Sequence, residues 1–288
     1  MYRALHAWRP PHTVESNCSG VRLHYSSRNI SGEEFYANAF ERRERELLDK
    51  IITPGLTVLD VGANLGFFTC LFAHRVGPTG RVIAFEPSPD TFRLLNENVR
   101  TNGFKDLVDC RCCALSDTEG TARLHVFSQG YEGYNSLGAS RFSDSCAAVA
   151  AIDVGTTTID RCLEQAGADS CKGYFIKVDV EGFEQRVLAG GLDHLNRIEN
   201  LSLMVELYEP SARQCGSSTL ETLDLLESCG FHAYRIAEIG DLAPLDGKSR
   251  AELIEARLYP NVFFFKPASM PRWLAGREVR SPGVVLPC

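Results

Sequence analysis

Two carboxylates near the middle of the chain are the residues best placed to do chemistry. Asp179 and Glu181 stand at the end of residues 174–180, an apolar, β-branched segment that predicts a buried strand. Glu206 ends the next predicted strand, 201–206. Ligands of open α/β sheets bind at the carboxyl ends of the strands, so the three side chains are expected to share one cleft. One carboxylate could act there as general base toward a substrate hydroxyl, or hold the substrate. The alternative for Asp179 and Glu181 is helix capping before Phe183.

The same three carboxylates could instead hold a divalent cation through oxygen ligands, but we predict no metal site. The sequence has 11 cysteines. The cluster Cys110, Cys112 and Cys113 lacks a fourth ligand at zinc spacing. We expect these cysteines to be buried and reduced, as small apolar side chains.

A glycine motif follows an earlier apolar segment, residues 57–61. It reads Asp60-Val-Gly62-Ala-Asn64-Leu-Gly66, which is Asp-x-Gly-x-x-x-Gly. The glycines allow a tight turn and close approach of a ligand to the backbone. Asn64 replaces the middle glycine of the dinucleotide fingerprint, and a carboxylate beside the loop suits an ammonium better than a pyrophosphate. The motif therefore favours S-adenosylmethionine over NAD.

Glu86 supports the same interpretation. It lies 20 residues beyond Gly66, at the end of a second apolar segment, 81–85. An acidic side chain at this place can accept hydrogen bonds from both ribose hydroxyls.

The elements that position these residues alternate in type. Strands are predicted at 57–61, 81–85 and 108–114, with helices at 67–75 and 89–98 between them. This alternation predicts an α/β fold with a mostly parallel sheet and helices on both faces. Residues 31–52 predict one helix, and 128–151 predict an irregular surface segment over the carboxyl ends of the strands.

The chain divides into three predicted parts. Residues 1–40 are an N-terminal arm or lid, of which residues 1–30 are predicted to be irregular. Residues 41–267 are the catalytic domain, and residues 268–288 are a poorly specified tail. The net charge of −7 argues against nucleic acid as a partner. No apolar run approaches the roughly 20 residues that span a bilayer, and the N-terminus lacks the apolar core of a signal peptide. We therefore predict no membrane contact and a cytoplasmic location, and we leave a homodimer open.

Five blocks of the sequence resemble the FkbM-type methyltransferase family in order and spacing. They are Val58–Gly66, Ala84–Pro87, Ala114–Asp117, Asn135–Leu137 and Lys177–Glu184. The similarity runs from about Glu41 to Lys266, and the last block together with Phe85-Glu86-Pro87 is the most diagnostic part. The arm before Glu33 and the number of cysteines depart from the family pattern.

The resemblance implies a Rossmann-like class I methyltransferase with a seven-stranded sheet. Its strand order would be 3-2-1-4-5-7-6, with the last inserted strand antiparallel. It also implies O-methylation of a hydroxyl on a small molecule, such as a sugar or a secondary metabolite, with S-adenosylmethionine as methyl donor. The expected cofactor-binding residues are Asp60, Gly62, Asn64, Gly66, Glu86, Pro87, Ser116 and Asp179. Asp179 and Glu181 are expected to be catalytic, and Asn135, Ser136 and Glu206 to bind the substrate.

Other functions stay open at this point. The chain could be a non-catalytic S-adenosylmethionine-binding partner protein, or a methyltransferase that acts on a nitrogen or on a macromolecule. An NAD-dependent oxidoreductase is disfavoured by the missing middle glycine.

Overall fold

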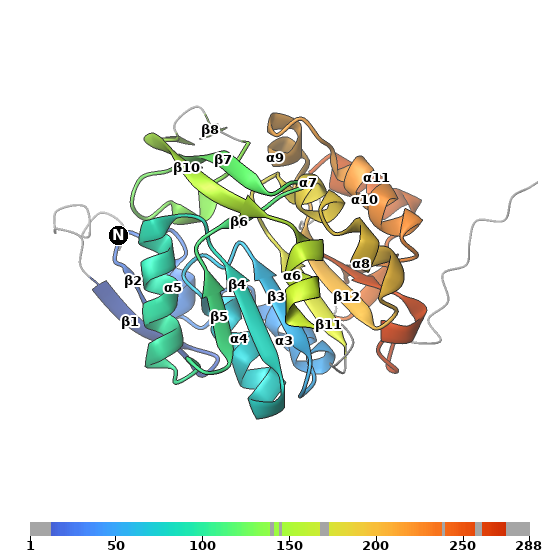
Figure 1. Cartoon of the computed structure of the whole chain (residues 1–288), viewed down its shortest axis with the longest axis horizontal. Coiled ribbons are helices and arrows are strands. Elements are labelled where there is room, and N and C mark those ends of the chain that lie inside the picture. The colour runs from blue at the N-terminus through green and yellow to red at the C-terminus, as the bar shows by residue number, and fades with distance from the viewer. Residues whose placement is uncertain are drawn as a thin grey trace, which may run out of the picture.

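The computed structural model describes residues 13–138, 141–143, 146–167, 173–237, 240–256 and 261–274. Its centre is a sheet of eight strands (Figure 1). From one edge to the other these are β14 (Leu242–Pro244), β13 (His232–Ile236), β15 (Asn261–Phe265), β12 (Leu201–Glu206), β11 (Tyr174–Val178), β3 (Thr57–Val61), β4 (Arg81–Phe85) and β5 (Val108–Arg111).

The predicted strand order is confirmed, whereas the predicted strand count is wrong by one. Strands β12, β11, β3, β4 and β5 run parallel, and β15 is antiparallel to both of its neighbours, β12 and β13. The additional strand is β14, which pairs with β13 over three residues at the edge. A strand this short carries no periodic pattern that the sequence could reveal.

Helices cover both faces of this sheet, as predicted. Their bounds are α2 (Gly32–Tyr36), α3 (Arg42–Ile51), α4 (Phe67–Val76), α5 (Pro89–Thr101), α6 (Ile159–Ala166), α7 (Glu184–Ala189), α8 (Leu192–Arg197), α9 (Glu209–Gln214), α10 (Thr219–Ser228) and α11 (Gly247–Ile254). Short 3-10 turns lie at Gly77–Thr79, Glu132–Tyr134 and Pro267–Ser269. Within the described residues, no helix is both long enough and apolar enough to cross a bilayer.

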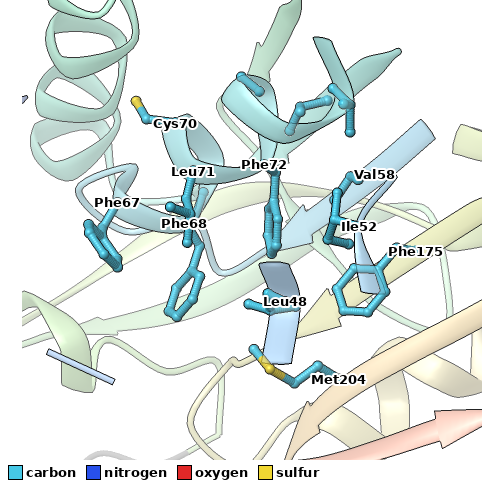
Figure 2. Close-up of a cluster of buried hydrophobic side chains, with 14 of the residues drawn as sticks. Leu48, Ile52, Val58, Phe67, Phe68, Cys70, Leu71, Phe72, Phe175 and Met204 are labelled. Atoms are coloured by element: carbon cyan, nitrogen blue, oxygen red, sulfur yellow. The ribbon is translucent and has the colours of Figure 1, made fainter. Parts of the chain in front are cut away.

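The core consists of two large clusters, one on each face. Successive residues of a strand point to opposite faces, so Val58 packs with α3 and α4 while Leu59 packs with α6 and α10. Figure 2 shows the first cluster, in which Phe72 of α4 lies beside Phe175 of β11. The ring centroids of these two residues are 5.7 Å apart. This packing fixes α4, and with it the glycine loop that precedes α4, against the sheet.

The prediction of an irregular arm over residues 1–30 is wrong where the structure describes it. Strands β1 (Thr13–Cys18) and β2 (Val21–Ser26) form an antiparallel hairpin beside α5 (Figure 1). Its inward residues Val21, Leu23 and Tyr25 are buried. Residues 1–12 of the predicted arm, and residues 275–288 of the predicted tail, lie outside the described residues.

The single helix predicted for residues 31–52 is also wrong, because the structure divides it into α2 and α3. Asn38 and Glu41, in the connection, have positive φ angles of 55° and 41°. The Asn38 side chain accepts hydrogen bonds from the Ser19 backbone at 2.9 Å and from Arg45 at 2.7 Å. These contacts with distant residues oppose the local helical preference.

A second sheet lies above the main one in the view of Figure 1. It contains β6 (Ala114–Leu115), β10 (Ala150–Thr157) and β7 (Gly120–Val126), and a two-stranded piece adds β8 (Arg141–Ser143) and β9 (Cys146–Ala147). The predicted strand 108–114 is therefore two strands in two sheets, and the predicted irregular segment 128–151 is partly strand. The alternation along β7 and β10 is weak because most of their side chains are exposed or half-buried.

Candidate active site

One cavity of about 1050 Å³ runs along the carboxyl edge of the main sheet. Its floor contains Asp60, Glu86 and Asp179, which end or follow β3, β4 and β11. Its walls include Phe35 and Glu41 from the α2–α3 region and Tyr134 from the segment after β7. A cavity of this size has room for two ligands of metabolite size, because small-molecule sites commonly enclose about 300–1,000 Å³.

The glycine loop packs closely against the neighbouring strands. Gly62 has φ +81°, and a Cβ added there would lie 1.8 Å from the carbonyl oxygen of Asp179. The amides of Gly62 and Ala63 both donate to the Phe85 carbonyl, at 3.1 and 2.9 Å. Gly66 has φ +85°, and a Cβ added there would lie 2.6 Å from Leu95 of α5. Gly62 thus permits the close approach of β3 to β11, and Gly66 that of α4 to α5.

Glu86 is held against this loop. Its Oε2 accepts a hydrogen bond from the Asn64 amide at 3.0 Å, and its Oε1 accepts one from the Ser88 amide at 2.9 Å. Burial raises the pKa of Glu86 to about 7, and the two amide hydrogen bonds oppose this rise. Each carboxylate oxygen has a second lone pair, so Glu86 can still accept hydrogen bonds from a ligand in the cavity.

A buried lysine compensates part of the negative charge. Lys177 Nζ lies 2.7 Å from Asp179 Oδ2, and its side chain is 4% exposed. Burial works to lower its pKa, but the charges of Asp179, Asp60 and Glu41 prevail, and the pKa of Lys177 is raised. A charged lysine therefore holds Asp179 in place beneath the cavity.

Asp60 lies fully buried beside this pair. Its Oδ2 accepts a hydrogen bond from Thr69 at 2.5 Å, and its Oδ1 has no hydrogen-bond partner among the described residues. Burial raises the pKa of Asp60, although Lys177 and Thr69 act against the rise. An unpaired buried oxygen is costly, and it is suited to a donor group supplied by a ligand.

The turn that presents Glu181 is built by Glu184 and Ser136. Glu184 Oε1 accepts hydrogen bonds from the amides of Val180 and Gly182 at 3.1 and 3.0 Å. The Ser136 hydroxyl donates to the Glu181 carbonyl at 2.9 Å. Glu181 itself has φ +55°, a conformation that non-glycine residues adopt rarely. These contacts hold the Glu181 side chain in the wall of the cavity.

Asp179, Glu181 and Glu206 meet in this cavity. One oxygen of each carboxylate lies within 4.8 Å of an oxygen of the other two. Burial and then the negative charges of the neighbouring carboxylates raise the pKa of Glu181 and Glu206 well above the usual value. A carboxylate of such a cluster takes up a proton more readily than an isolated carboxylate does, which is the property a general base needs.

Most of the residues predicted for the site line the cavity. These are Asp60, Gly62, Asn64, Glu86, Pro87, Asn135, Asp179, Glu181 and Glu206. Gly66, Ser116 and Ser136 are absent from its wall. Ser116 is buried, with its hydroxyl on Asp117 at 2.9 Å, whereas its neighbours Ala114 and Leu115 line the cavity. Ser136 supports the turn that carries Glu181, and Gly66 packs against α5.

Sequence reasoning did not assign roles to Lys177, Glu184 or Glu41. An ion pair of Lys177 could have been predicted, because a lysine inside a buried apolar strand requires an anionic partner. Glu184 lies in a recognisable block, but only the structure shows its carboxylate on the turn amides. Glu41 gave no local signal, since the fold brings it to the cavity from a connection between helices.

The predicted cofactor fits this arrangement. Two buried side-chain oxygens have no hydrogen-bond partner among the described residues: Asp60 Oδ1 and Asn64 Oδ1. Both residues line the cavity at the glycine loop. These oxygens suit the ammonium group of an amino-acid moiety, and Glu86 suits hydroxyl donors. The acidic floor also suits a ligand that carries positive charge.

Known proteins give an independent comparison. The family model "Methyltransferase FkbM domain" matches residues 60–233. Methyltransferase sdnD of Sordaria araneosa is 26% identical over 210 residues, covering 65% of this chain and 79% of the relative. The 31-O-demethyl-FK506 methyltransferase FkbM of Streptomyces tacrolimicus is 42% identical over 76 residues, covering 26% of this chain and 28% of the relative.

Among solved structures, a methyltransferase FkbM from Methylobacillus flagellatus is 15% identical with a TM-score of 0.46. The similarity covers 74% of this chain and 44% of that chain. The family match spans more than half of the present chain and contains the glycine loop, Glu86 and the Asp179–Glu184 turn. The chain therefore belongs to the FkbM methyltransferase domain family, as an enzyme that uses S-adenosylmethionine as its methyl donor.

Proposed function

We propose that this enzyme methylates a hydroxyl group of a small molecule. The observation that carries the proposal is that one cavity contains both the glycine loop and carboxylates of raised pKa, Glu181 and Glu206. Transfer of a methyl group to a hydroxyl requires alignment of donor and acceptor and removal of one proton. The two requirements are met on neighbouring strands of one sheet edge.

In this proposal, Asp60, Gly62 and Asn64 hold the methionine end of the cofactor, and Glu86 with Pro87 holds its ribose. The bound cofactor supplies a methyl group on a positively charged sulfur. Asp179, fixed by Lys177, orients the acceptor beside that group. Glu181 accepts the hydroxyl proton, and Asn135 and Glu206, which line the same cavity, contact the acceptor.

The relatives support the proposed acceptor class. The name of the Streptomyces relative describes O-methylation of a demethylated small molecule, FK506. Its similarity is confined to 76 residues, so it supports the type of reaction and gives no identity for the acceptor. Methylation of a nitrogen or of a macromolecule, and cofactor binding without catalysis, are the alternatives. The cytoplasmic location stays a prediction, and the homodimer stays open.

The test is turnover with a panel of sugars, polyketides and amines, followed by release of S-adenosylhomocysteine. Mass spectrometry of each product would locate the new methyl group. We expect turnover on hydroxyl-bearing acceptors, and a loss of about a hundredfold or more for Glu181→Gln, the size expected for a general base. Glu164→Gln, an exposed carboxylate on α6, serves as the matched control and should leave turnover unchanged.

Three results would count against the proposal. Products methylated on nitrogen alone would place the acceptor in another class. Binding of S-adenosylhomocysteine without turnover across the panel would favour a non-catalytic partner protein. Full activity in an Asp179→Ala, Glu181→Ala double variant would remove both residues from the chemistry.

A further inference from the structure

An arginine in the wall of the cavity has no counter-charge. Arg235, near the end of β13, is half-buried and lines the same cavity as the glycine loop and the carboxylates. Among the described residues it forms no ion pair, and its side chain donates a hydrogen bond only from Nε, to Ser249 Oγ at 2.8 Å. The two Nη groups therefore keep their N–H donors for a ligand, and such donors suit an anionic group.

Contacts at the start of α11 hold this guanidinium in one orientation. Ser249 is buried, and its amide donates at 2.8 Å to Oδ1 of Asp246, the N-cap of α11. Hydrogen bonds from the amide and the hydroxyl of Ser249 lower the pKa of Asp246, and the charge of Arg235 adds to this effect. The Ser249 oxygen thus accepts from Arg235 while its proton is directed to Asp246. Asp246 is engaged by α11, and the Nη end of Arg235 is left available.

The register of the sheet places Arg235 at a short distance from the reacting carboxylates. Val205 of β12 pairs with Val262 of β15, and Val262 pairs with Arg235 of β13. Neighbouring strands lie about 4.8 Å apart, so the backbone of Arg235 is roughly 10 Å from that of Val205, the residue before Glu206. A ligand of metabolite size can therefore contact Glu206 with one group and Arg235 with another.

We propose that the acceptor carries an anionic group, such as a carboxylate, that binds the Nη groups of Arg235 while its hydroxyl lies at Glu181. The planar guanidinium can bind such a group through two parallel hydrogen bonds. The carboxylates at the reacting end repel an anion, and Arg235 attracts it, so the two ends of the cavity orient the acceptor in one direction. Arg235 is thus a specificity-determining residue. The inference rests on the proposed function, since it names the acceptor class for the same site.

The experiment compares matched pairs of acceptors on the full chain. Hydroxy carboxylic acids are paired with their methyl esters, and sugar phosphates with the parent sugars. Release of S-adenosylhomocysteine gives kcat/KM for each compound, and calorimetric titration into the chain saturated with S-adenosylhomocysteine gives its affinity without turnover. We expect the anionic member to be preferred about tenfold or more in one of the two classes, because the neutral member lacks the charged hydrogen bonds. The preferred class identifies the anion as a carboxylate or a phosphate.

Arg235→Gln should lower this preference at least about tenfold, mainly through a higher KM, because the contact is made in the ground state as well as in the transition state. Arg42→Gln is the matched control. Arg42 also lines the cavity and its replacement removes the same charge, but its side chain is 75% exposed and pairs with Glu46 at 2.9 Å. The control should keep the preference of the unaltered chain.

Binding of S-adenosylhomocysteine shows that each variant is folded. If Arg235→Gln fails to bind it, Arg235→Lys replaces this variant; it keeps the charge but loses the planar fork, so it should also raise KM for the anionic member. Equal kcat/KM and equal affinity within every pair overturn the inference and leave the proposed function intact. A preference that Arg235→Gln and Arg42→Gln lower alike overturns it too. Anion binding that depends on Arg235 without methylation of any hydroxyl supports the anion site and contradicts the proposed function.

Discussion

Gly62 follows β3 and lies close to the backbone that follows β11, and its φ angle is +81°. Replacement by alanine would place a Cβ 1.8 Å from the Asp179 carbonyl, so β3 and β11 would have to separate. We expect Gly62→Ala to lower the free energy of unfolding by roughly 2–3 kcal/mol and to weaken S-adenosylhomocysteine binding.

The matched control for this change is Gly103→Ala. Gly103 has φ +77°, and a Cβ added there would meet nothing within 4 Å. Gly103→Ala therefore introduces the same backbone strain, roughly 1 kcal/mol, without a steric clash between the new Cβ and neighbouring atoms. Urea unfolding of both variants gives the comparison, and equal losses of stability would contradict the role assigned to close packing at Gly62.

Glu86 should make cofactor binding depend on pH. Its pKa is raised to about 7 by burial, so below pH 7 the free protein carries it mainly as the neutral acid. Ribose hydroxyls donate to the ionised form, so affinity should rise as the pH increases through 7. A single group with this pKa makes S-adenosylhomocysteine binding about tenfold weaker at pH 6 than at pH 8. Calorimetry at both pH values measures the ratio, and Glu86→Gln should remove it; an unchanged ratio in that variant would assign the effect to another group.

Some residues of the site could be predicted from the sequence, and others could not. Asp60, Glu86 and Asp179 could be predicted because each lies near the carboxyl end of an apolar strand, and parallel strands place these ends at one edge. Ser116 and Ser136 were predicted from the family resemblance alone, and a position in a motif does not say whether a side chain faces the cavity or the turn behind it. Glu41 could not be predicted at all, since its place depends on a break in a helix that distant residues cause.

The β1–β2 hairpin is joined to the glycine loop through one side chain of α5. Asn98 is fully buried; its Nδ2 donates to the Leu65 carbonyl at 2.8 Å, and its Oδ1 accepts from the His24 amide at 2.7 Å. Asn98→Ala leaves these backbone groups unpaired and should cost roughly 2–3 kcal/mol of stability. It should also weaken S-adenosylhomocysteine binding, because Leu65 belongs to the loop that lines the cavity.

Asn102, which immediately follows α5, provides the control for Asn98. It bonds the hairpin through the Arg22 amide and carbonyl, at 2.9 and 2.8 Å, and has no hydrogen bond to the glycine loop. Asn102→Ala should therefore lower stability without changing cofactor affinity. A similar loss of affinity in both variants would mean that the hairpin, and not the Asn98–Leu65 contact, governs the loop.

Elements buried on both faces could be predicted from sequence more closely than the others. The segments 57–61 and 81–85 are near-continuous apolar runs, and their predicted bounds are those of β3 and β4. The hairpin was missed although Val21, Leu23 and Tyr25 alternate as a half-buried strand requires, because polar residues outnumber them nearby. Strands β7 and β10 expose much of their surface, so their pairing is set by tertiary context.

At the scale of the whole molecule, the β1–β2 hairpin is part of the folded core. Val21, Leu23 and Tyr25 are buried against the same cluster as Phe68 and Phe72. A chain that begins after Ser26 loses this burial, which is worth roughly 5 kcal/mol, a large share of the stability of a typical domain. We expect the shortened chain to unfold at much lower urea concentration than the full chain. An unchanged urea midpoint would mean that the hairpin is a dispensable arm.

The cavity itself is a property of the complete fold. Its wall combines strand ends of the main sheet with Glu41 before α3 and Arg235 at the end of β13. The sheet edge could be predicted from sequence, but the walls could not, because they come from connections whose conformation depends on distant contacts. The identity of the acceptor depends on these walls, whereas the binding of the cofactor depends on the edge.

The measurement that tests the central claim most directly is calorimetric titration of the purified full chain with S-adenosylhomocysteine, with NADH as the control. We predict micromolar binding of S-adenosylhomocysteine, about −8 kcal/mol, and no binding of NADH. A folded chain that binds NADH, or that fails to bind S-adenosylhomocysteine, would contradict the assignment of the glycine loop and Glu86 to the methyl donor.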